Sequence, residues 1–152
     1  MDRSPHVDIR VTQRLSAPAD RVFDAWLDPD IAGKWLFATA WRPLSRAEID
    51  ARKGGSFCLA DGKGADYTGV YIEIARPRRL VFTLNLDNRP RVVTRVTAEI
   101  RPLKTGCELR LVHEGVPLVQ AGAIENRWTG MLYGLGEMLE SRGRALPVSA
   151  AS

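Results

Sequence analysis

Cysteine is scarce in this sequence, with only Cys58 and Cys107 among 152 residues. Neither belongs to a Cys-x-x-Cys or Cys/His cluster, which argues against structural zinc. Each lies inside an apolar alternating run, so we expect both to be reduced and partly buried in strands. A chain of this length buries roughly two thirds of its unfolded surface and needs no cross-links. We therefore expect a single domain over residues 1–152, with an ordered core over about 7–142 and tails at 1–6 and 143–152.

Long hydrophobic runs are also missing. No stretch approaches the ~18 apolar residues that a membrane-spanning helix requires. The first ten residues, MDRSPHVDIR, have an aspartate in second place and no apolar run, so we expect no signal peptide. We therefore expect a cytoplasmic protein without a membrane span.

A basic stripe with interleaved aromatic residues, which is typical of nucleic-acid-binding proteins, is absent as well. The net charge is +4, but the arginines are dispersed. Their densest groups, broken by proline, asparagine or apolar residues, are Arg76, Arg78 and Arg79, and Arg89, Arg91 and Arg95. We therefore expect solvated turns and strand faces rather than a nucleic-acid partner. The chain also has no nucleotide-binding loop, metal motif or recognisable nucleophile context, so we expect no cofactor and no metal.

Most of the chain alternates between apolar and polar residues, the period of a half-buried strand. The strands that this pattern predicts are 7–15, 48–52, 56–60, 67–75, 80–86, 92–102 and a seventh after Gly106. In the seventh strand, Leu109, Leu111 and His113 share the inner face. Tight turns such as Gly54-Gly55 join the successive strands from the second onward, which makes them antiparallel.

Helical signals occur in two places. After Pro18, the spacing of Val22, Phe23 and Trp26 predicts a short helix, and Asp28 can cap a second one over Asp30–Trp35. Near the end of the chain, apolar residues recur every three or four positions over Val119–Arg142, which predicts a long amphipathic helix. Its apolar face needs a cover, and the strands can supply it. The expected architecture is therefore an α+β fold with two layers.

Several motifs occur together in a specific order along the chain. They are Ser16-Ala17-Pro18, Val22-Phe23-x-Ala25-Trp26-x-Asp28-Pro29, Trp35, Glu48-Ile49-Asp50-x-Arg52-x-Gly54-Gly55-x-Phe57, Gly69-x-Tyr71-x-Glu73-Ile74, Pro77-Arg78-Arg79-Leu80-Val81-Phe82-Thr83, His113-Glu114-Gly115 and Trp128. In this order the chain resembles the SRPBCC (START-like) superfamily, and within it the homologues of the activator of the heat-shock protein 90 ATPase. The resemblance implies a helix-grip fold, in which a curved antiparallel sheet of about seven strands wraps a long C-terminal helix. It also implies a cavity for an apolar small molecule.

The residues that could line such a cavity are mainly aromatic. The candidate ligand-binding residues are Trp35, Phe57, Tyr71, Phe82, His113, Trp128, Leu132 and Tyr133. Trp128 and Leu132 are the strongest candidates, because they lie in the middle of the long helix on the face that meets the sheet. The alternative for each aromatic residue is plain core packing. Alternation leaves the orientation of Tyr71 and Glu73 open, since apolar residues occupy both faces of that strand.

His113 is the one weak candidate for a catalytic residue, since a general base needs a tuned pKa and a substrate within reach. The alternative is a histidine that bonds the backbone where the strand turns into the helix. The sequence therefore leaves three functions open. The first is the binding of an apolar or amphipathic small molecule. The second is protein interaction, as a chaperone regulator or a homodimer, which predicts an exposed apolar patch. The third is a cyclase or lyase that uses the same cavity.

Overall fold

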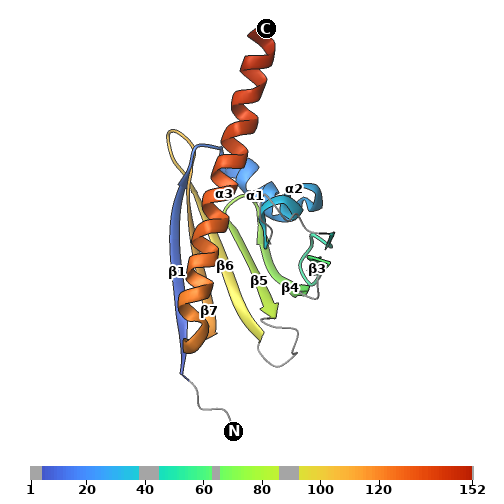
Figure 1. Cartoon of the computed structure of the whole chain (residues 1–152), viewed down its shortest axis with the longest axis vertical. Coiled ribbons are helices and arrows are strands. Elements are labelled where there is room, and N and C mark those ends of the chain that lie inside the picture. Colours follow the sequence, from blue (N-terminus) through green and yellow to red (C-terminus); the bar gives the residue numbers. More distant parts are fainter. Residues whose placement is uncertain (1–4, 38–44, 63–65, 86–92, 152) are drawn as a thin grey trace.

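The computed structural model describes residues 5–37, 45–62, 66–85 and 93–151, with side chains described as far as residue 140. Figure 1 shows the predicted order of one strand, two short helices, six strands and a long helix. The elements are β1 His6–Leu15, α1 Ala19–Leu27, α2 Pro29–Trp35, β2 Arg46–Ile49, β3 Ser56–Ala60, β4 Asp66–Ala75, β5 Arg79–Asn85, β6 Val93–Pro102, β7 Cys107–Pro117 and α3 Leu118–Ala151. The predicted strand ends Leu86 and Val92 lie outside the described residues.

The seven strands form one antiparallel sheet in the order β1-β7-β6-β5-β4-β3-β2. The predicted antiparallel succession of strands is confirmed from β2 to β7. β1 pairs with β7, for example Val11 with Leu111, and so closes the far edge of the sheet. The sheet curves around α3, which crosses its concave face (Figure 1). The helix-grip prediction is therefore confirmed.

The predicted alternation in β7 is also confirmed. Leu109, Leu111 and His113 are at most 1% exposed, and they face the interior together with Val96 of the neighbouring β6. Because side chains alternate across a strand, the charged residues between them lie on the outer face. There Arg101 and Arg110 each form an ion pair with Glu108.

β4 resolves the orientation that alternation left open. Tyr71 is buried, whereas Ile72 is 37% exposed, and the pairing with β5 shifts register between Tyr71 and Glu73. Glu73 therefore lies outside, where it accepts a hydrogen bond from Arg79. Gly69 sits closely against the next strand, since a Cβ there would lie 1.8 Å from the carbonyl oxygen of Thr83. The close approach of the neighbouring backbone therefore explains why residue 69 is a glycine.

Both predicted short helices form, but only the second has a side-chain cap, because α1 begins after Pro18 without one. The Asp28 side chain accepts a hydrogen bond from the Asp30 amide at 2.9 Å, and α2 begins at Pro29, one residue earlier than predicted. Pro29 fits there because the N–H groups of the first helical turn have no partner within the helix, so the N–H that proline lacks is not missed. The two helices are fastened to each other by Trp35, whose Nε1–H donates to the Ala25 carbonyl at 2.8 Å.

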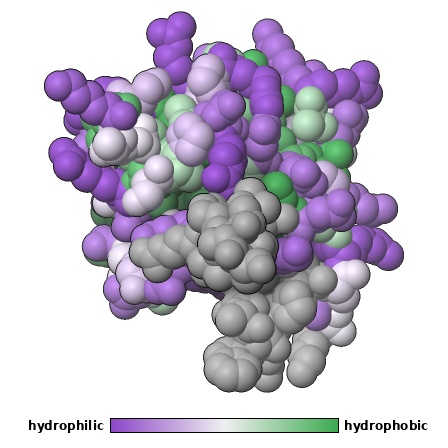
Figure 2. All heavy atoms as spheres, turned by 90° about the horizontal axis from the view of Figure 1, so that it is seen from above, coloured by the Kyte–Doolittle hydropathy of each residue, from purple (hydrophilic) through white to green (hydrophobic). Residues whose placement is uncertain are grey.

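The long helix α3 differs from its prediction in length. We expected it to end at Arg142, but it continues to Ala151 and projects beyond the sheet (Figure 1). The added stretch contains the good helix formers Ala145, Leu146 and Ala150, but also Gly143 and Pro147, so its helical propensity is mixed. Seen along the projecting helix, hydrophilic side chains dominate the rim of the molecule (Figure 2). None of the helices in the described part of the chain is long and apolar enough to cross a membrane.

Both cysteines are free, as the sequence predicts. Cys107 is fully buried at the start of β7, and Cys58 is half-buried in β3. Burial raises the pKa of the Cys107 thiol, because the thiolate would lose its hydration. The thiol therefore stays protonated and packs as a small apolar group.

Candidate ligand-binding site

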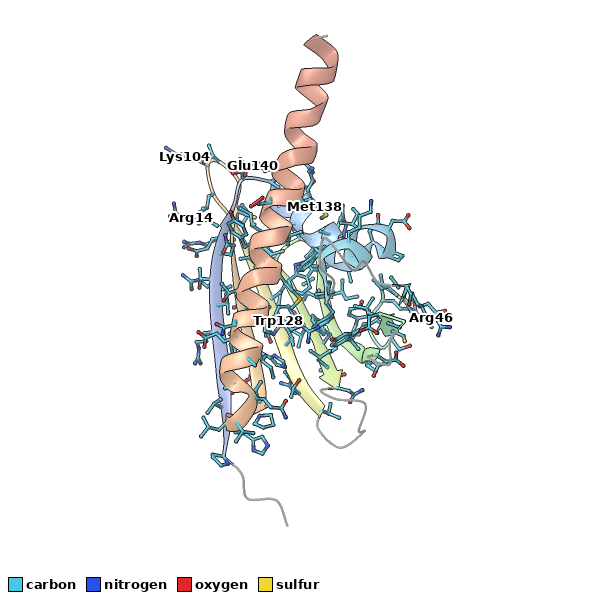
Figure 3. All side chains as sticks on the ribbon, viewed as in Figure 1. Arg14, Arg46, Lys104, Trp128, Met138 and Glu140 are labelled. Carbon is cyan, nitrogen blue, oxygen red and sulfur yellow. The ribbon has the colours of Figure 1, made fainter. Side chains whose placement is uncertain are left out.

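The structure brings most of the predicted site residues together between the sheet and α3. Trp35, Phe57, Tyr71, Phe82, His113, Trp128 and Leu132 are each no more than 5% exposed. Trp128 extends from α3 over the concave face of the sheet (Figure 3).

Tyr133 is the exception among the predicted residues, with 59% of its surface exposed. Five residues along a helix correspond to a turn of about 140°, so Tyr133 points away from the face that Trp128 occupies. Its neighbour is Glu137, one helical turn further on, whose hydrogen bond raises the pKa of the Tyr133 phenol. Together with Arg14 and Ser16 of the β1 end, these residues line an open surface groove rather than the interior.

Trp26 of α1 is at the centre of the interior. Its ring contacts those of Trp35, Phe82 and Trp128, with centroids 4.8, 6.0 and 6.0 Å away. Phe82 in turn contacts Phe57 at 5.5 Å. Edge-to-face and tilted contacts of this kind stabilise an aromatic core beyond its simple burial.

A chain of buried hydrogen bonds connects α3 to the sheet beneath these rings. The Trp128 Nε1–H donates to His113 Nδ1 at 3.0 Å, and His113 Nε2 lies 2.6 Å from Thr94 Oγ1. The Thr94 hydroxyl donates to the Leu84 carbonyl at 2.7 Å. Because an indole N–H can only donate, His113 Nδ1 must accept, and its proton therefore resides on Nε2. Every step of the chain then has one donor and one acceptor.

These hydrogen bonds limit the chemistry that His113 can perform. Burial lowers the pKa of the imidazole to about 4, so the ring is neutral near pH 7. Its single lone pair accepts the Trp128 proton, which leaves none free to take a proton from a substrate. Both bonds of the ring go to side chains, so His113 does not bond the backbone as the alternative interpretation had it. The arrangement fits a structural connection between α3 and the sheet rather than a general base.

Trp26 carries the one buried side-chain polar atom in the described part of the chain that has no hydrogen-bond partner. That atom is Nε1, and the residue itself is 1% exposed. Trp26 borders a small apolar void whose other lining residues are Leu36, Ile49, Phe57, Leu59, Tyr71, Leu80 and Phe82. The void has a volume of about 10 Å³, at the lower limit for a single water molecule.

Tyr71 is the other polar residue beside the void. Burial raises the pKa of its phenol, and the nearby carboxylate of Asp50 raises it further. The phenol is therefore protonated near neutral pH, and it can act as a donor. Trp26 and Tyr71, which each carry a hydrogen-bond donor, thus line an otherwise apolar space.

Phe37, Tyr67 and Arg127 form a cluster at the surface end of the interior, which we call the rim cluster. The rings of Phe37 and Tyr67 stack with centroids 4.3 Å apart and an angle of 6° between their planes. The Arg127 guanidinium lies over both rings, 5.9 Å from Phe37 and 5.0 Å from Tyr67, and donates to the Tyr67 hydroxyl. Phe37 also contacts Trp128 at 5.6 Å. The rim cluster therefore continues the aromatic interior to the surface.

Sequence reasoning missed the rim cluster and Thr94 as site residues. The three rim residues lie far apart in the chain, and the irregular stretch after Phe37 gives no periodicity. Thr94 carries a usable signal, because it shares the inner face of its predicted strand with apolar residues, as His113 does in the next strand. Two inward polar residues on neighbouring strands predict a buried hydrogen bond. Among the described residues, histidine, cysteine, aspartate and glutamate form no group of three able to hold a metal ion.

Known structures share this fold. A protein from Chromobacterium violaceum is 29% identical, with 88% of this chain and 96% of that chain covered and a TM-score of 0.73. One from Rhizobium leguminosarum is 23% identical over 91% of this chain and 97% of that chain, with a TM-score of 0.78. An HSP90 activator from Plasmodium falciparum is 24% identical over 88% of this chain and 96% of that chain, with a TM-score of 0.71. The last two show the shared fold.

A comparison with curated proteins gives no match. The family model described as "Activator of Hsp90 ATPase homolog 1-like protein" matches residues 16–140, from the end of β1 into α3. This match spans most of the chain and includes the short helices, the sheet from β2 to β7 and Trp128. The chain therefore belongs to the family of Activator of Hsp90 ATPase homolog 1-like proteins, within the SRPBCC superfamily.

Proposed function

We propose that the protein binds an apolar or amphipathic small molecule between the sheet and α3. The observation that carries the proposal is that Trp26, whose buried indole N–H has no hydrogen-bond partner, lines an apolar void. Buried polar groups in folded proteins nearly always have a partner, and one without a partner calls for an explanation. An oxygen atom of a bound molecule would accept this hydrogen bond, while its apolar body would contact the surrounding rings.

The void at Trp26 is much smaller than the ~300 to 1,000 Å³ of ordinary ligand pockets. A ligand must therefore displace side chains as it enters, and the bound form is more open than the one seen here. The lining includes Ile49 of the short edge strand β2, which is only half-buried. An edge strand gives way at lower cost than the central strands, because it has one neighbour fewer.

Two alternatives have less support. The chaperone-regulator function rests on the family and on the printed description of the P. falciparum protein, at 24% identity. The large exposed apolar side chains among the described residues are spread over β4, β6 and two separate parts of α3, rather than gathered on one element. Adding the protein to heat-shock protein 90 and measuring the ATPase rate tests this function, and an unchanged rate rejects it. The enzymatic alternative loses its one candidate base, since the lone pair of His113 is engaged.

The binding proposal is tested with N-phenyl-1-naphthylamine, a neutral apolar dye that fluoresces when it leaves water. We expect saturable binding of one dye per chain, in the protein as it is purified. Ile49→Trp fills the void and should weaken binding, whereas Ile72→Trp places the same side chain on the exposed face of β4 and should not. Absence of saturable binding, or equal effects of both variants, would overturn the proposal.

A further inference from the structure

We propose that the rim cluster is a recognition site for the anionic group of an amphipathic ligand, with Arg127 as its charged contact. This inference rests on the proposed function and names the chemical class of the ligand. Its basis is the position of one exposed guanidinium directly above the aromatic row.

Arg127 has no ion-pair partner among the described residues. Its contacts are the Tyr67 hydroxyl and the faces of two rings. Several other arginines differ, since Arg76 pairs with Asp24 and Arg79 pairs with both Glu73 and Glu99. Arg10 on β1 also lacks an ion pair among the described residues, but unlike Arg127 it has no contact with the aromatic row. A guanidinium has five N–H donors, and the Tyr67 hydroxyl and the ring faces leave donors open for an incoming carboxylate, sulfonate or phosphate.

The rings beneath Arg127 provide the path for the apolar part of the ligand. Phe37 contacts Tyr67 on one side and Trp128 on the other, and Trp128 contacts Trp26. The row thus leads from the charged rim to the void that Trp26 lines. An amphipathic anion could place its charge at Arg127 and its apolar body along this row.

Phe37 is the part of the row that can yield most readily. Its φ of +56° lies in the left-handed region, which costs a non-glycine residue on the order of 1 kcal/mol. Its backbone N–H donates to the sulfur of Met131 at 3.0 Å, and a thioether is a weak acceptor. Strained residues of this kind cluster at ligand clamps and switch regions. Displacing the Phe37 side chain would open the side of Trp128 that it contacts.

The test compares N-phenyl-1-naphthylamine with 8-anilinonaphthalene-1-sulfonate, which has the same skeleton and an added sulfonate. We expect Arg127→Gln to weaken binding of the sulfonate about tenfold or more, and to change binding of the neutral dye less than about twofold. Arg127→Lys keeps the charge and should retain part of the affinity. Arg10→Gln removes an equal charge from an exposed position on β1 and should leave both dyes unaffected.

The outcomes separate the two proposals. If neither dye binds the unaltered chain with saturation, the proposed function itself fails. If the neutral dye binds but Arg127→Gln leaves the sulfonate unchanged, only the rim-cluster inference is overturned. Equal losses with Arg10→Gln and Arg127→Gln would also overturn it, since they would assign the effect to net charge. Circular dichroism of each variant establishes that it is folded.

Discussion

His113 is a residue whose surroundings oppose its own protonation. A proton on Nδ1 would face the N–H of Trp128, so two donors would meet in a buried space. Desolvation acts in the same direction and lowers the imidazole pKa to about 4. The residue therefore links the stability of the fold to acidity, although it takes no part in proton transfer.

The first prediction concerns this link. In the unfolded chain His113 has its ordinary pKa of about 6.5. Between pH 6.5 and 4 the unfolded chain therefore binds a proton at His113 that the folded chain does not bind. The free energy of unfolding should fall by about 3 kcal/mol as the pH drops through this window. His113→Gln should lose this part of the pH dependence, whereas His6→Gln, at an exposed position, should retain it. Urea unfolding at a series of pH values measures both, and an unchanged slope in His113→Gln would contradict the assignment.

The second prediction concerns the Thr94 hydroxyl, which lies next to His113 in the chain of buried hydrogen bonds. Thr94→Val removes the acceptor of the His113 Nε2–H and should lower the free energy of unfolding by about 1–3 kcal/mol. Thr97→Val, on the opposite face of the same strand, is the matched control, because the Thr97 hydroxyl takes no part in the hydrogen bonds that join Thr94 to His113 and Leu84. Chemical denaturation gives both values. Equal effects of the two substitutions would mean that the hydrogen-bond chain contributes nothing.

At the scale of elements, α3 combines a buried apolar face with glycines on its outer side. A Cβ added at Gly122, Gly130 or Gly134 would meet nothing within 4 Å, whereas at Gly136 it would lie 2.9 Å from Leu15 Cδ2. Packing against the sheet thus explains Gly136 alone. The outer glycines lower the intrinsic stability of the helix without a packing reason in the described residues.

The third prediction follows from this difference. Gly134→Ala should raise the free energy of unfolding by up to about 1 kcal/mol, because alanine has the higher helix propensity and the site is open. Gly136→Ala should gain less or lose stability, since the side chain of Leu15 must move. Thermal unfolding of the two variants side by side checks this ordering. A loss of stability in Gly134→Ala would show that something packs on that face.

The elements could be predicted wherever one periodicity dominated. Leu109, Leu111 and His113 alternate cleanly, and their inward orientation followed from the sequence. The orientation of Tyr71 could not, because the β4 pattern is apolar on both faces and a register shift follows the residue. The end of α3 was also missed, since small residues after Arg142 are compatible with both a tail and a helix.

At the scale of the whole molecule, the order of strands and helices predicted the two layers of the fold but not the geometry of the candidate site. The pairing of β1 with β7 joins segments about a hundred residues apart, and local pattern carries no information on such a contact. The rim cluster is a second case, because Phe37, Tyr67 and Arg127 meet only after the sheet has closed around α3. The aromatic residues of the interior could be named from the sequence. The hydrogen-bond chain and the partnerless donor of this interior depend on the folded geometry.

The central proposal also concerns the whole molecule: the aromatic interior opens to bind a small molecule. The indole N–H signals in nuclear magnetic resonance spectra test it directly, because these tryptophans differ in their partners. Trp35 and Trp128 bond to Ala25 and His113, whereas Trp26 has no partner. In a titration with N-phenyl-1-naphthylamine, we expect the Trp26 and Trp128 signals to move with saturation while that of Trp35, fastened to the backbone of α1, moves less. Unmoved signals of Trp26 and Trp128 at saturating dye would contradict a binding site in the interior.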